Sequence, residues 1–89
     1  MSLNITKESI DIGLVTGNIE AMTEFYRDTL GLEVEAVLDM PGGMQMTRLI
    51  CGSTIIKLVV LPDTPAAQNP PGGFSGGTGI RYFTISVGT

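Results

Sequence analysis

Apolar residues alternate with other residues along residues 9–15, where Ile10, Ile12 and Leu14 share one side of an extended chain. A period of two is typical of a β-strand, so this segment is predicted to be the first strand. Gly13 lies in its middle. A glycine inside a strand indicates that backbone or a ligand approaches closely there.

The spacing of apolar residues changes to the period of a helix between residues 19 and 30. Asn18 precedes this stretch as a helix N-cap, and Gly31 follows it as a residue suited to the left-handed C-cap. We therefore predict an amphipathic helix that lies on a sheet. Its apolar stripe consists of Ile19, Met22, Phe25, Tyr26 and Leu30.

Three further strands follow the helix and are separated by short turns rich in glycine. The turn at residues 40–43 contains Pro41 and Gly42, which suit a reverse turn. The last of the three strands is apolar almost throughout, with Lys57 in its middle, so we expect it to be covered on both faces. The predicted strands are residues 32–39, 44–51 and 54–61.

Residues 62–79 differ in kind from the rest of the chain because they hold four prolines and five glycines. Such a long segment without regular structure indicates a linker or a functional loop. Its glycines at residues 72–79 do not match a phosphate-binding loop, since neither the motif spacing nor a following helix is present. Residues 80–87 then alternate again and are predicted to form a strand.

This organisation predicts an α+β fold with a first module at residues 9–61 and a linker at residues 62–79. Residues 80–89 would be the first strand of an incomplete second module. That strand has no hairpin mate in the sequence. Either a second chain supplies the mate, or the natural protein continues past Thr89.

The composition supports a small globular domain. The chain has 89 residues, of which 43% are hydrophobic and 16% charged, with a mean hydropathy of +0.30. This charge content lies below the usual share of about 25%, which argues against disorder. A chain of this length buries only roughly 60–65% of its unfolded surface, so uncovered apolar faces should find a partner.

The charge balance and the single cysteine narrow the choice of partners and compartment. The net charge is −4, which makes nucleic acid and anionic membranes poor partners. Cys51 is alone, so no internal disulfide forms and a cytoplasmic location is expected. With no histidine or evident base in the chain, a catalytic role for this thiol is disfavoured. The N-terminus lacks the features of a signal peptide, and no apolar run is long enough to cross a membrane.

Several phrases of the sequence resemble the vicinal oxygen chelate superfamily, which includes glyoxalases, bleomycin resistance proteins and extradiol dioxygenases. The strongest is Phe-Tyr-Arg-Asp-x-Leu-Gly-Leu at residues 25–32, and residues 11–15, 18–21 and 79–83 add to it. The resemblance implies βαβββ modules that work in pairs around a concave site. In metal-dependent members, a divalent ion there is held by His and Glu side chains.

At the positions where the resemblance implies metal ligands, this chain carries Asp11, Lys57 and Tyr82. A protonated lysine brings positive charge and donors only, so we expect no metal and no other cofactor. The resemblance implies that the first and fourth strands lie side by side, with Asp11 and Lys57 facing one cavity. We therefore hypothesise that an ion pair between these two residues takes the place of the metal. A purely structural pair, or a lysine that extends to solvent, is the alternative.

The predicted cavity would be lined by side chains from several strands. Arg48 could hold an anionic group of a ligand or simply be solvated, and Tyr82 could donate a hydrogen bond or simply pack. Met46 could line an adaptable apolar pocket or fill the core. No catalytic residue is assigned. The proposed cavity residues are Asp11, Gly13, Met46, Arg48, Lys57, Tyr82 and Thr84.

The resemblance leaves three functions open. The first is a protein that binds a small organic molecule between modules without metal, as bleomycin resistance proteins do. The second is a metal-dependent lyase or dioxygenase of the glyoxalase or extradiol type, and the third is a truncated module without activity. We expect a homodimer, formed either with or without an exchange of strands through the linker.

Overall fold

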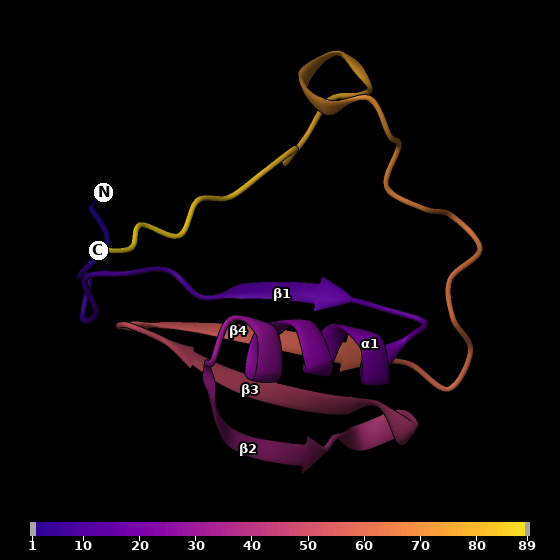
Figure 1. Ribbon diagram of the computed structural model, residues 1–89, viewed down its shortest axis with the longest axis horizontal. Helices are drawn as coiled ribbons and strands as arrows, with labels where there is room; N and C mark the ends of the chain where they lie inside the picture. The colour runs from indigo at the N-terminus through magenta and orange to yellow at the C-terminus, as the bar shows by residue number, and fades with distance from the viewer. Residues whose placement is uncertain (1, 89) are drawn as a thin grey trace.

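The computed structural model describes residues 2–88 and contains one mixed sheet of four strands with a single helical segment across it (Figure 1). The order of the strands is β1-β4-β3-β2, so the first and fourth strands are neighbours, as expected. β1 runs parallel to β4, whereas β4, β3 and β2 are antiparallel to one another. This is the predicted α+β arrangement of a βαβββ module. The strands are β1 (Ile12–Val15), β2 (Glu33–Asp39), β3 (Gln45–Cys51) and β4 (Thr54–Val60).

The helix begins where the sequence predicts. The side-chain oxygen of Asn18 accepts a hydrogen bond from the Ala21 N–H at 3.2 Å, which satisfies a backbone donor of the first turn. Gly31 ends the segment with a φ of +78°, a conformation that favours glycine. Within residues 2–88, no helix is long and apolar enough to cross a membrane.

The amphipathic helix predicted over residues 19–30 is present, but the hydrogen-bond pattern of its second half is not that of an α-helix. Only α1 (Ile19–Thr23) is α-helical, and a wider π-helical segment, η1 (Glu24–Thr29), continues it. In η1 the N–H of Leu30 donates to the carbonyl of Phe25 at 2.9 Å, one residue further back than in an α-helix. The apolar periodicity does not distinguish these two hydrogen-bond patterns.

The core lies between the helical segment and one face of the sheet. Leu49, Ile56 and Leu58 are fully buried there, and Tyr26 from η1 packs with them. Because side chains alternate along a strand, these residues assign every second position of β3 and β4 to the helix side. The residues between them point to the opposite face.

The segment after β4 leaves the sheet and returns towards the N-terminus (Figure 1). Arg81 holds part of it together, because its guanidinium donates to the carbonyls of Gly73 and Pro70 at 2.7 and 2.6 Å. One short 3-10 turn, Gly73–Ser75, lies within it.

The strand predicted at residues 80–87 requires correction. Residues 80–88 form no strand in the described chain, although Ile85 packs against the core. A strand exists only with a hydrogen-bonded neighbour, and alternation alone does not supply one.

Candidate functional site

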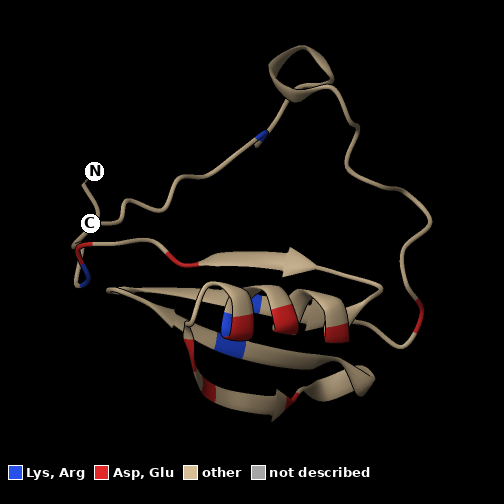
Figure 2. Cartoon of the chain, in the orientation of Figure 1, with Lys and Arg blue, Asp and Glu red and all other residues tan. Residues whose placement is uncertain are grey.

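The face of the sheet opposite the helix carries charged side chains at its centre. Arg48 of β3 and Lys57 of β4 lie directly across from each other in the strand register. They alternate with Leu49 and Ile56 of the core, so their side chains point to the open face. Figure 2 shows positive residues on these two central strands and negative residues on the helical segment and on β2.

Each of the two cations is paired with a carboxylate from an outer strand. The Arg48 Nε donates to Glu35 Oε1 at 2.8 Å, and the Lys57 Nζ lies 3.9 Å from Asp11 Oδ2. Asp11 directly precedes β1, and Glu35 lies on β2. The four side chains therefore form a charged row across the whole sheet, with the two cations in the middle.

The ion pair between Asp11 and Lys57 is present in the structure, as hypothesised. Asp11 is also held by two other donors: Lys7 Nζ at 2.5 Å and the Ile55 N–H at 2.9 Å. The hydrogen bond from Lys7 is the main cause that lowers the pKa of the Asp11 carboxyl below its usual value of 3.8. The bond from Ile55 lowers this pKa as well, and the charge of Lys57 contributes least. Asp11 thus links the N-terminal segment to the start of β4.

Sequence reasoning did not identify Lys7 and Glu35 as members of this group. Lys7 and Asp11 are four residues apart, but this spacing predicts a contact only in a helix, and residues 7–11 are not helical. Glu35 has no local signal either, because it lies at an irregularity in the pairing of β2 with β3, between Val34 and Ala36. Such a bulge changes which face a side chain occupies.

Gly13 and Met46 lie on the same open face as the charged row. Gly13 is paired with Lys57 in the register, and Met46 is paired with Val59. A Cβ atom placed on Gly13 would meet nothing within 4 Å, so no backbone of residues 2–88 makes the predicted close approach. The space above Gly13 is open.

Tyr82 and Thr84 do not join this group within one chain. Tyr82 is 66% exposed and packs edge-on against Phe74, with ring centroids 5.2 Å apart. It borders a hollow with Ile12 and Leu14, which face the helix side. Thr84 borders a neighbouring hollow with Ile12. Their predicted place in a cavity would therefore require another arrangement of the C-terminal segment.

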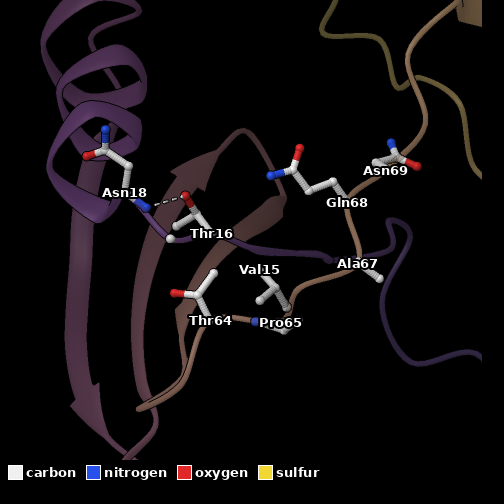
Figure 3. A pocket seen from close by; sticks show the side chains of 9 residues that line it. Val15, Thr16, Asn18, Thr64, Pro65, Ala67, Gln68 and Asn69 are labelled. Atoms are coloured by element: carbon white, nitrogen blue, oxygen red, sulfur yellow. Dashed lines mark hydrogen bonds between the residues drawn. The ribbon is translucent and has the colours of Figure 1, made fainter.

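A separate hollow of about 600 Å³ lies beside the ends of β1 and β4 (Figure 3). Residues 15–18 line one side, and residues between 64 and 69 line the other. The Thr16 hydroxyl accepts a hydrogen bond from the Asn18 N–H at 2.9 Å (Figure 3). The lining contains no ionisable side chain, so this hollow offers polar contacts but no acid–base group.

The donor set of the charged row does not fit a divalent metal. The Lys57 ammonium lies beside the Asp11 carboxylate, where it would repel a cation and offers no lone pair to one. In residues 2–88, no three His, Cys, Asp or Glu side chains gather closely enough to hold a metal ion.

Comparisons with known proteins agree with the fold. Residues 10–89 match the family model of the Glyoxalase/Bleomycin resistance protein/Dioxygenase superfamily. The structure resembles SMU.1112c, with a TM-score of 0.68 and 19% identity over 88% of this chain and 62% of that one. It also resembles the hypothetical protein BH1468 from Bacillus halodurans C-125, with a TM-score of 0.58 and 23% identity.

The match to BH1468 covers 66% of this chain and 44% of that one. The chain thus spans less than two thirds of either solved relative. No curated protein matches it.

Proposed function

Because the chain belongs to the Glyoxalase/Bleomycin resistance protein/Dioxygenase superfamily, we propose that it binds a small organic molecule without a divalent metal. The ligand lies on the open face of the sheet. A second copy of the chain supplies the other wall of the cavity.

The observation that carries this proposal is the charged row at the position where the family resemblance places metal ligands. An ammonium, rather than a fourth-strand carboxylate, faces Asp11 across 3.9 Å. The same face provides some apolar surface next to the charges, since Met46 and Ile50 on it are partly exposed. Their strand neighbours Val59 and Ile55 are buried. A mainly apolar surface with a few fixed polar groups is typical of small-molecule sites.

The homodimer in this proposal is supported by apolar side chains that one chain leaves uncovered. Ile80, Tyr82 and Val87 of the C-terminal segment are each at least 66% exposed, and Val15 of the edge strand β1 is 57% exposed. Burial of such residues against a second copy would remove apolar surface from water. The alternating pattern at residues 80–87 would then find the strand neighbour that it lacks.

Metal analysis of the purified protein tests the absence of a metal ion. We expect no stoichiometric divalent metal in the wild type after dialysis against Mn²⁺, Ni²⁺ or Zn²⁺. The variant Lys57→Glu restores a carboxylate beside Asp11 and is expected to retain more metal. Stoichiometric metal in the wild type would refute the proposal and favour a metal-dependent lyase or dioxygenase.

Sedimentation equilibrium tests the dimer, and thermal stabilisation by a panel of small planar compounds tests ligand binding. We expect a dimer at micromolar concentration and a higher Tm with at least one compound. A stable monomer would count against the shared cavity. A Tm unchanged by every compound would count against a binding function.

A further inference from the structure

We propose that Arg48 and Lys57 together bind an anionic group of the ligand, a carboxylate or a phosphate, at the centre of the open sheet face. This inference rests on the proposed function and specifies the chemical class of the ligand. The juxtaposition of the two cations, directly opposite each other on neighbouring strands, carries it.

Two like charges opposite each other in a sheet destabilise it unless something compensates them. The two carboxylates that pair with these cations, Glu35 and Asp11, lie on the outer sides of the sheet. No carboxylate lies between Arg48 and Lys57 among the described residues. Glu35 accepts one hydrogen bond from the Arg48 Nε, and in residues 2–88 no acceptor contacts the two terminal amino groups of Arg48. These amino groups remain as paired donors, the geometry that suits carboxylate and phosphate oxygens.

The positive charge of Lys57 is also only partly neutralised by its carboxylate partner. Its distance of 3.9 Å to Asp11 is too long for a hydrogen bond, whereas Lys7 contacts the same carboxylate at 2.5 Å. Among the described residues, the Lys57 ammonium donates no hydrogen bond. Its side chain is only 30% exposed, so it is not simply extended into water.

The local charge at this face is opposite in sign to that of the whole chain. Lys7, Lys57 and Arg48 meet only Asp11 and Glu35, which leaves one positive charge in excess. The chain as a whole carries −4. An anion would remove this excess, and one placed between Arg48 and Lys57 would replace their mutual repulsion with attraction.

The remaining arginines do not form a comparable site. Arg27 is engaged by Asp28 through two hydrogen bonds on the helical segment, and Arg81 donates to carbonyls of the linker. Apolar pairs flank the cation pair on both sides in the strand register: Met46 with Val59 and Ile50 with Ile55. The ligand is therefore expected to combine an anionic group with an apolar body.

Titration calorimetry and amide chemical shifts with three probes test this inference: benzoate, its neutral isostere benzamide, and inorganic phosphate. We expect benzoate to bind at least about tenfold more tightly than benzamide, because hydrogen bonds to charged groups are the stronger ones. Arg48→Gln should abolish this preference. Glu35→Gln should increase benzoate affinity, because it removes the carboxylate that competes for Arg48. Arg27→Gln, on the helical segment, is the matched control and should change neither affinity.

The outcomes separate this inference from the proposed function. If benzoate and benzamide bind this face equally well, the anion site is refuted and small-molecule binding stands. If phosphate and benzoate bind equally well through Arg48, the anion site stands and the organic ligand is refuted. If neither anion shifts the amide signals of β3 and β4, the anion site is refuted. A purely structural role for the charged row does not predict the increase in benzoate affinity expected for Glu35→Gln. An unchanged benzoate affinity in this variant would therefore also refute the inference.

Discussion

Replacement of Leu49 by alanine tests the assignment of the two faces of the sheet, on which the position of the charged row depends. Leu49 is fully buried and lies between Val34 and Ile56 in the strand register. Removal of a leucine side chain from such a position costs about 2–5 kcal/mol, because apolar contacts are lost and a cavity remains. A chain of 89 residues has a total stability of about 4–13 kcal/mol. The substitution should therefore remove a large fraction of the free energy of unfolding.

The matched control is Leu38→Ala, which changes the same residue type on the other face of the same sheet. Leu38 is paired with Met46 and is 40% exposed, so its replacement should cost well under about 1 kcal/mol. Urea unfolding followed by circular dichroism measures both variants, at two protein concentrations because association would add to stability. Equal losses for the two variants in a monomeric sample would refute the assignment of faces and the charged row with it.

Three further predictions concern the Asp11 carboxylate, the helix cap at Asn18 and the linker glycine Gly76. Asp11→Asn should lower the stability at neutral pH, and the difference from the wild type should narrow as the pH falls from about 5 towards 2. The lowered pKa of Asp11 makes its contribution present above the usual pKa of 3.8 and lost during acidification; a pH-independent difference in urea midpoint would contradict this. Asn18→Ala should cost about 1 kcal/mol in thermal or urea unfolding, whereas Asn18→Ser should retain most of the stability; equal losses would argue against the cap. Gly76→Ala should accelerate limited proteolysis of the linker, because its Cβ would lie 1.9 Å from the Pro71 carbonyl oxygen, and Gly88→Ala, with open space around it, should not.

The fold could be predicted from the sequence to a considerable degree because its signals are local. Alternation identified the first strand, the glycine-containing turns separated the next three, and the caps at Asn18 and Gly31 marked the ends of the helical segment. These signals depend on a residue and its immediate neighbours in the chain. The resemblance to the superfamily then indicated that the first and fourth strands are neighbours in the sheet. Local patterns carry no information about which strands pair.

The candidate site could be predicted only in part. Asp11, Arg48 and Lys57 were expected to share a cavity, and the structure brings them to one face. Tyr82 and Thr84 lie elsewhere in the single chain, because residues 80–88 have no strand neighbour to hold them. Lys7 and Glu35 were not predicted. The contact of Lys7 with Asp11 depends on the path of the backbone before β1, and that of Glu35 with Arg48 depends on the irregularity in β2.

The sequence by itself determined which segments are extended, which segment is helical and which side chains are charged, because periodicity and capping act over a few residues. Only the tertiary structure decided that two carboxylates and two cations form a row across four strands. Asp11 and Lys57 are far apart in the chain, and Glu35 reaches Arg48 through an irregularity in strand pairing. Such distances follow from the register of hydrogen-bonded strands, which is a property of the folded sheet rather than of any one segment.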